Sequence, residues 1–381
     1  MVAMISEERK DVNVKTAQLV QLITEIGPDI PEIARKLGQF KESVRYRYKE
    51  KLLSRGFTVQ AMPDHERLGL KRLILIADFE RAYADYAQAI LTAMNELCFV
   101  VSYARCIPEG CYVVNFSVPR ERAEELKGFL NHLRDKGMFS RFELFEFDWL
   151  RNVPMRAEFY DFDTGRWDYD WAVRATGDSG VNGRAPSDPT KFDYTDLLII
   201  KELQMDANKS LKDISDKLQV NYKKLAWHYN AHVVQSRLLK GYRINWMGTG
   251  YDYKIDKALN RKHRYLWVDL IVAGTSEHER AILGKKFSQL PFLWAEAGGL
   301  NYFAEIAFPV DYVVEGLGFL EEAVSTVKDR FRMLLMDQSN AVAFSIPYEA
   351  YDQERRQWSF NRSDLTVRFD NLIQQIAERA G

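Results

Sequence analysis

Hydrophobic positions along the chain recur at two periods, and the two periods follow one another in the same order twice. Leu19, Leu22 and Ile26 have the spacing of one helical face, and the Gly-Pro pair that follows ends this helix. Two further short helices are indicated, the last over 41–54, and an extended piece follows at 56–59. Helix, turn, helix and strand in this order predict a winged helix-turn-helix.

Short apolar runs rich in β-branched residues replace the helical spacing from residue 72 onwards. Their order is strand, helix, strand, strand, helix, strand, which closes as a ferredoxin-like layer with both helices on one face. The other face stays apolar and needs a cover, which a second module of the same kind would supply, in this chain or in another. The strands are expected at 72–78, 99–105, 111–118 and 139–147, and the second helix at 120–136.

The whole pattern occurs a second time. Ile33–Leu37 matches Ile214–Leu218 at an offset of 181 residues, and similar offsets align the later strands and two aromatic-rich hairpins that contain Trp167 and Trp358. Each tryptophan is expected to pack on the sheet that precedes it, in a structural or dimer-contact role. We therefore predict the class α+β, with two copies of a winged helix-turn-helix plus a ferredoxin-like βαββαβ (RAM-like) domain. The expected units are 12–62 and 68–172, a linker over 173–190, then 191–247 and 260–363, and a C-terminal helix over 364–381.

Charge is unevenly distributed although the totals nearly cancel, with 53 Lys and Arg against 54 Asp and Glu. Residues 30–60 hold eight Lys or Arg against three Glu, and 209–243 hold eight against two Asp. The two segments therefore carry net charges of +5 and +6, and the remainder carries −12. An acidic body with two basic helical heads is the pattern expected of a protein that binds double-stranded DNA through the heads.

The third helix of each head is the predicted DNA-reading element, because this helix enters the major groove in helix-turn-helix proteins. Lys and Arg there mostly contact phosphates, and the two heads differ in their groove-facing residues, so they are expected to read different half-sites. The predicted DNA-binding residues are Lys41, Ser43, Arg45, Tyr46, Arg47 and Lys49 in the first copy, and Asn221, Tyr222, Lys223, Lys224, Ala226, Trp227, His228 and Asn230 in the second.

The residues 192–218 and the helix 42–57 resemble the DNA-binding head of the Lrp/AsnC, or feast/famine, transcription regulators. That family pairs this head with a βαββαβ effector domain, so the resemblance covers most of the chain twice. It implies a tandem-duplicated, archaeal-type, sequence-specific DNA-binding regulator that is not an enzyme. Such a regulator is expected to form a homodimer and to act in the cytoplasm, at the nucleoid. Two copies in one chain depart from the usual single-copy member and indicate a pseudo-dimer.

The same resemblance implies an amino-acid effector at a turn between the second and third strands of the effector domain. The corresponding residues here are Gly110 and Tyr112 in the first copy, and Gly299 and Asn301 in the second. Each turn keeps a glycine and a tyrosine, but neither keeps the family's aspartate. A tight turn with a packing role is the favoured interpretation of both.

Other chemistry receives little support from the residues. His228 and His232 have the i, i+4 spacing that can hold Zn²⁺, but no third ligand is evident, so a groove or phosphate role is preferred and neither a metal nor a cofactor is predicted. Two alternatives remain open. One is an enzyme of the siroheme decarboxylase type, since those proteins resemble Lrp/AsnC proteins. It would require basic and histidine side chains gathered in the bodies. The other is an assembly or partner-binding module.

Overall fold

The computed structural model describes residues 2–171, 188–246 and 265–380. The predicted linker therefore lies largely outside the described residues. Within the described ranges, none of the helices combines the length and the apolar character that a membrane crossing requires.

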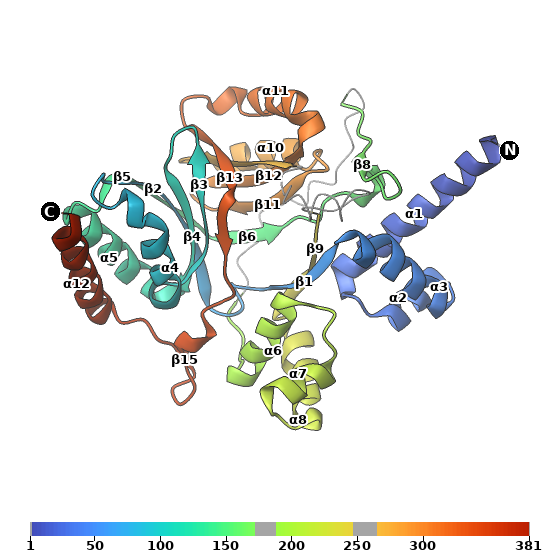
Figure 1. Cartoon of the computed structure of the whole chain (residues 1–381), viewed down its shortest axis with the longest axis horizontal. Coiled ribbons are helices and arrows are strands. Elements are labelled where there is room, and N and C mark those ends of the chain that lie inside the picture. Colours follow the sequence, from blue (N-terminus) through green and yellow to red (C-terminus); the bar gives the residue numbers. More distant parts are fainter. Residues whose placement is uncertain (1, 172–187, 247–264, 381) are drawn as a thin grey trace.

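The protein has a mixed α+β fold built on a large antiparallel sheet (Figure 1). Nine strands lie in the order β5-β2-β4-β3-β13-β10-β12-β11-β6. The strands of the first half-sheet are β2 (Leu70–Phe79), β3 (Val100–Ile107), β4 (Tyr112–Pro119) and β5 (Phe139–Phe147), and those of the second half-sheet are β10 (Tyr265–Val272), β11 (Leu293–Gly298), β12 (Tyr302–Pro309) and β13 (Phe331–Ala343).

Two strands cross between the half-sheets and join them. β13 pairs with β10 through its first part and with β3 through its second part. β5 pairs with β2 at one end of the strand order, and β6 (Trp149–Asn152) pairs with β11 at the other end. Because only Asp148 separates β5 from β6, the sheet returns on itself and the two half-sheets face one another. The apolar face that needed a cover is thus covered within a single chain.

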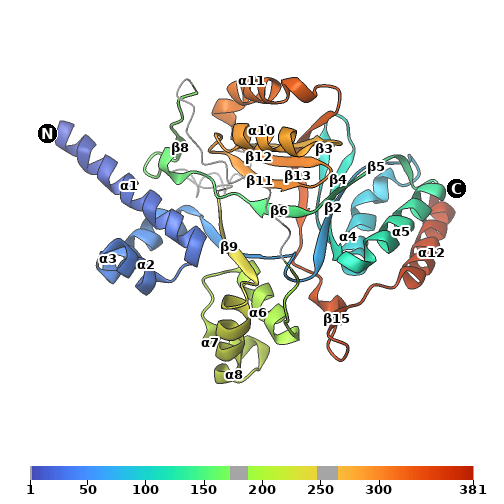
Figure 2. The same cartoon turned by 180° about the vertical axis from the view of Figure 1, so that it is seen from behind.

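Helices cover the outer face of each half-sheet (Figures 1 and 2). The inner faces pack together, with the rings of Phe147 and Phe303 5.9 Å apart. The strand and helix order expected from the sequence is confirmed in both copies. The covering helices are α4 (Ala87–Cys98), α5 (Ala123–Asp135) and the C-terminal α12 (Arg362–Ala380) on the first half-sheet, and α10 (Glu277–Phe287) and α11 (Val313–Ala323) on the second.

The two helical heads are joined through their strands. β1 (Thr58–Pro63) of the first head pairs with β9 (Leu239–Asn245) of the second, with a bulge at Met62/Pro63. In each head the third helix continues into a π-helical turn, over 48–52 and 229–234. The helices of the first head are α1 (Val2–Ile26), α2 (Ile30–Leu37) and α3 (Lys41–Arg47), and those of the second are α6 (Tyr194–Met205), α7 (Leu211–Leu218) and α8 (Tyr222–His228).

The aromatic hairpins pack on the opposite copy, which corrects the prediction that each packs on its own sheet. Trp167 follows the first body, yet its Nε1 donates to the Tyr265 hydroxyl of the second at 3.0 Å. Trp358 follows the second body, and its Nε1 donates to the Leu68 carbonyl at 2.7 Å. A buried indole usually finds a hydrogen-bond partner for its N–H, and for both tryptophans the opposite copy supplies that partner. The hairpins are β7 (Tyr160–Asp161) with β8 (Arg166–Trp167), and β14 (Tyr351–Asp352) with β15 (Gln357–Trp358).

The crossing at β6 depends on two glycines at the end of β11. A Cβ on Gly298 would lie 2.5 Å from the Trp149 ring, and a Cβ on Gly299 would lie 2.8 Å from the Asp148 carboxylate. Both distances are too short for real carbon contacts. The strand β6 can therefore lie against β11 only because these two positions have no side chain.

The substitution Gly298→Ala is expected to destabilise the protein by about 1–3 kcal/mol, because the added methyl must displace the Trp149 ring. Urea unfolding measures this change. Gly318→Ala is the matched control, since its Cβ would meet nothing within 4 Å on exposed helix α11, and it should leave stability equal or raise it by up to about 1 kcal/mol. Equal stability of the two variants would contradict the proposed role of Gly298.

Candidate active site

A cleft of about 150 Å³ opens where the crossing strand β6 meets β2 and β9. Residues from both copies line it, and basic and aromatic side chains are prominent among them. Its walls comprise Pro63, His65, Glu66, Leu70, Lys71, Arg72, Arg120, Phe147, Asp148, Trp149, Leu150, Asn152 and Lys240.

Arg72 and His65 form the inner part of the cleft. Burial lowers the pKa of Arg72 to about 10, although the Glu305 carboxylate opposes this effect, and its Nη1 has no hydrogen-bond partner among the described residues. Burial also lowers the pKa of His65 well below its ordinary value, helped by the charges of Arg72 and Lys240. His65 is therefore neutral near pH 7, and its Nδ1 hydrogen-bonds the Ser117 hydroxyl.

The two lysines of the cleft lie beside acidic partners, and Arg120 lies at the rim. The Lys240 ammonium lies 2.8 Å from the Glu66 carboxylate and donates to the Leu150 carbonyl at 2.9 Å. The Lys71 ammonium lies 2.7 Å from the Glu146 carboxylate. Arg120 lies exposed at the rim. The basic groups thus outnumber the two acids of the lining, Glu66 and Asp148, and the cleft suits an anionic ligand.

Two carboxyl groups lie behind the cleft on the inner face of the second half-sheet. Asp269 and Glu305 are direct partners in the β10–β12 ladder. Glu305 lies two residues after Phe303 and therefore on the same face of the sheet as Phe303, whose ring packs against Phe147. Burial raises the pKa of Asp269 well above its ordinary value, and the neighbouring Glu305 adds to this. Burial also raises the pKa of Glu305, against the charges of Arg243 and Arg72. The pair therefore retains a proton at pH values where exposed carboxyls are ionised.

Arg243 and Asn152 connect the cleft to this carboxyl pair. The guanidinium of Arg243 lies 4.3 Å from the centre of the Trp294 ring and hydrogen-bonds the Asn152 side chain. Burial lowers its pKa to about 10, with Glu305 opposing. Two half-buried arginines, a histidine and two carboxyl groups with shifted pKa values thus lie close together, and such groups cluster at functional sites.

Sequence reasoning missed this cleft. Its residues come from separated segments at 63–72, 120, 147–152 and 240, which meet only because β6 crosses to the other copy. Lys240 and Arg243 fall within the basic segment 209–243 of the second head, but both lie on β9. Lys240 lines the cleft, and Arg243 hydrogen-bonds Asn152 of the cleft wall. The one available signal was the basic run Lys71-Arg72 at the start of an otherwise apolar strand.

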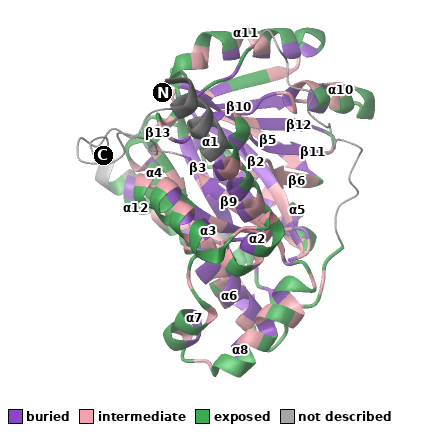
Figure 3. Cartoon of the chain, turned by 90° about the vertical axis from the view of Figure 1, so that its right-hand side faces the viewer, coloured by how far each residue is buried: buried purple, intermediate pink, exposed green. Residues whose placement is uncertain are grey.

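The residues predicted to face DNA lie on the third helices, as expected, and most are exposed (Figure 3). Tyr46 is 68% exposed and Trp227 57% exposed. Arg45 is paired with Glu42 at 2.8 Å, and Arg47 donates to Gln39. Lys41, Ser43, Lys49, Asn221, Tyr222, Lys223, Lys224 and Asn230 are exposed, and Ala226 is half-buried. A contact of these residues with DNA stays a prediction.

His228 does not face outward, which corrects its assignment to the groove-facing set. Only 4% of its surface is exposed, and its Nδ1 lies 2.9 Å from a carboxylate oxygen of Asp196 on α6. Asp196 is the third residue of α6, where its side chain accepts from the Asp193 amide, and it is itself fully buried. The imidazole therefore turns inward because a buried carboxylate requires a partner.

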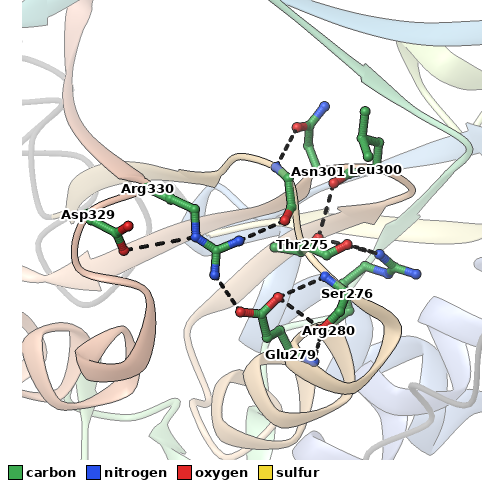
Figure 4. A network of polar contacts seen from close by, with 9 residues as sticks. Thr275, Ser276, Glu279, Arg280, Leu300, Asn301, Asp329 and Arg330 are labelled. Carbon is green, nitrogen blue, oxygen red and sulfur yellow. Dashed lines mark hydrogen bonds and ion pairs between the residues drawn. The ribbon is translucent and has the colours of Figure 1, made fainter.

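The turns predicted to bind an effector are tied into the protein. The Asn301 Nδ2 donates to the Glu146 carbonyl at 3.2 Å, and its Oδ1 accepts from the Gly274 amide at 3.2 Å, in a region where Arg330 and Glu279 add further contacts (Figure 4). Gly299 makes room for Asp148. In the first copy Gly110 has a left-handed φ of 81°, and Tyr112 is buried. Packing explains these residues, and effector binding by them stays a prediction.

Comparison with known proteins identifies a shared fold and no close relative. No family model matches the chain, and no curated protein matches it. The solved structure of the siroheme decarboxylase NirDL in complex with an iron-uroporphyrin III analogue matches 89% of this chain and 94% of its own, with a TM-score of 0.50 and 10% identity. A second structure of NirDL matches 85% and 91%, with a TM-score of 0.48 and 11% identity. The chain is thus similar in fold to siroheme decarboxylase over nearly its whole length.

These comparisons correct the identification as a DNA-binding regulator of the Lrp/AsnC family and the expectation that the chain is not an enzyme. No regulator family matches, whereas the structure that spans both copies is that of an enzyme. The enzymatic alternative is the one whose fold the matched structure shares. The physical error lay in summing charge over the bodies, since a net charge of −12 outside the heads does not exclude a local basic cleft.

The buried carboxyl pair predicts an unusual pH dependence of stability. The unfolded chain releases the Asp269 proton at lower pH than the folded protein does, so stability falls as the pH rises from the unfolded pKa towards the folded one. Asp269→Asn removes this loss and should be more stable than the wild type near pH 7, by on the order of 1 kcal/mol. Urea unfolding between about pH 4 and pH 8 measures the difference.

Glu279→Gln is the control with the opposite sign. A backbone hydrogen bond from Ser276 and the Arg330 guanidinium lower the pKa of Glu279 to about 2, so its stabilising effect is present above the unfolded pKa and is lost as the pH falls. This variant should be less stable than the wild type near pH 7. If Asp269→Asn behaves in the same way, the assignment of a raised pKa to the pair is wrong.

Proposed function

We propose that this protein binds a tetrapyrrole bearing several carboxylates in the basic cleft and removes carboxyl groups from it, as an enzyme of the siroheme decarboxylase type. The observation that carries the proposal is the cleft itself, in which Arg72, Lys240 and His65 meet beside the Trp149 ring. Gathered basic and histidine side chains in the bodies are the feature that such chemistry requires. The shared fold supports the proposal, because it spans both copies.

The cleft suits one edge of such a ligand. Its volume of about 150 Å³ admits carboxylate side chains and part of a ring, while the macrocycle would extend across the mouth. The Arg72 Nη1, which has no hydrogen-bond partner within the described ranges, can donate to a carboxylate in the low-dielectric interior. The Lys71 and Lys240 ammonium groups and the exposed Arg120 would bind further carboxylates at the wall and the rim.

Decarboxylation breaks a carbon–carboxylate bond, releases carbon dioxide and leaves an electron pair on carbon that must accept one proton. The Asp269 and Glu305 pair is the proposed source of this proton, because burial keeps it protonated at pH values where ordinary carboxyls are ionised. Arg72 links the cleft to this pair, because it lines the cleft and its charge lowers the pKa of Glu305. Neutral His65 would orient a carboxylate by hydrogen bonding.

We infer further that the two three-helix heads are winged helix-turn-helix units that serve here to connect the bodies. The strand after each third helix pairs with that of the other head, β1 with β9, and β9 then supplies Lys240 to the cleft. Several head cations are held by acidic partners, among them Lys209 and Lys217, each 2.6 Å from Glu202. Homodimer formation stays a prediction.

The binding proposal is tested by titrating the protein with siroheme and following the visible absorption. Arg72→Gln and Lys240→Gln should each weaken binding by roughly 10- to 100-fold, because each removes a charged hydrogen-bond donor from a partly dry site. Lys49→Gln, at an exposed position of the first head, is the matched control and should bind as the wild type does. An unchanged siroheme spectrum in the presence of the wild-type protein would refute the proposal.

Turnover is tested separately by mass spectrometry of siroheme after incubation with the protein. Asp269→Asn combined with Glu305→Gln should slow the loss of carbon dioxide by about 100-fold, because the proton donor is removed, while the dissociation constant for siroheme changes little. Binding without any loss of carbon dioxide by the wild type would mean that the cleft holds a tetrapyrrole for another purpose.

A further inference from the structure

A group of four metal-ligating side chains lies in the second head, away from the cleft. Asp193 caps the N-terminus of α6, and Asp196 is the third residue of that helix. His228 ends α8, and His232 lies in the π-helical turn that follows. The two aspartates are three residues apart and the two histidines four, so each pair lies on one helical face. The packing of α6 against α8 then brings the four side chains together.

The arrangement of the donor atoms is compact. The Nδ1 atoms of His228 and His232 lie 2.9 Å from the two different oxygens of the Asp196 carboxylate. The Asp193 carboxylate lies 3.6 Å from the His228 Nδ1. One donor atom from each of the four residues can be chosen so that all lie within 4.8 Å of one another. Bonds of about 2.0–2.1 Å in a tetrahedral zinc site place donors about 3.3 Å apart, so small side-chain rotations would suffice.

Electrostatics favours a cation at this position. Asp196 is fully buried, and burial is the main cause that raises its pKa, with the nearby Asp193 carboxylate acting in the same direction. Two carboxylates held beside two imidazoles make a site of negative potential, which one divalent ion would offset. The Trp227 ring packs on both imidazoles, at 5.0 and 4.8 Å between ring centroids, and partly screens the group from water.

We propose that Asp193, Asp196, His228 and His232 form a structural binding site for a divalent transition-metal ion of the zinc class. Two imidazole nitrogens select zinc, cobalt or nickel over magnesium and calcium, which prefer oxygen ligands. Four protein ligands complete a tetrahedral shell, which is typical of structural sites and not of catalytic ones. The ion would fasten the first helix of the head to the third.

The site belongs to the second copy alone. At the offset of 181 residues, the first head has Val12, Lys15, Arg47 and Lys51 in place of the four ligands. Three of these are cationic and cannot hold a metal ion. The proposal therefore requires one ion per chain, although the heads are duplicated.

Cobalt(II) titration of the untagged, chelator-treated full-length protein tests the proposal. One equivalent per chain should give the visible absorption bands of tetrahedral cobalt, and zinc should abolish them by displacement. Zinc should also raise the thermal midpoint by several degrees, because the ion binds the folded state only. If the protein binds less than one equivalent of cobalt, or binds it only with octahedral geometry, the proposal is overturned and the four residues form a histidine–carboxylate hydrogen-bond network.

Two variants keep the test independent of folding. Asp193→Asn retains a side chain that caps helices well but removes one charged ligand, and His232→Gln changes a half-buried position. Each should weaken cobalt binding at least 10-fold and reduce the thermal shift by zinc, with the apo-protein still folded. His278→Gln, at an exposed histidine of α10, should change neither quantity. Unchanged binding by both ligand variants would place the ion elsewhere and refute the site.

Discussion

The structure depends on the mutual burial of two apolar sheet faces within one chain. A ferredoxin-like layer has helices on one side only, so each copy leaves a face that water would solvate unfavourably. β13 and the nearly continuous β5 and β6 each pair with strands of both copies, which holds the faces together by backbone hydrogen bonds as well as by apolar contact. The close approach at Gly298 and Gly299 makes the second crossing possible.

The basic cleft is a consequence of that crossing. β6 brings Trp149 and Asn152 to the entrance of the space between the sheets, and the pairing of β1 with β9 brings Lys240 from the second head. Arg72 and the Asp269 and Glu305 pair are then enclosed by apolar layers on both sides. Enclosure in a low-dielectric interior shifts all of their pKa values towards the neutral forms, which is the electrostatic setting that acid–base chemistry uses.

Charge sums along the sequence were misleading for a physical reason. Net charge describes the long-range field of a segment, whereas binding depends on which charged groups share a low-dielectric space and which are already paired. Arg45 and Lys217 contribute to the basic sum of the heads, yet each lies beside a carboxylate of its own head. Arg72 contributes little to any segment sum, yet it lines the cleft with an Nη1 that has no hydrogen-bond partner in the described part of the chain. His228 shows the same limit, because helical spacing alone could not reveal the Asp196 carboxylate that turns it inward.

The sequence by itself determined the α+β class, the duplication and the order of helices and strands, because hydrophobic periodicity and Gly-Pro punctuation act over a few residues and repeat in both copies. Only the tertiary structure decided that the copies pair within one chain, that the hairpins of Trp167 and Trp358 pack on the opposite copy, and that the basic side chains converge. Those outcomes depend on contacts between residues separated by up to 290 positions. Such contacts are selected by the shape and burial of whole faces, which no local pattern encodes.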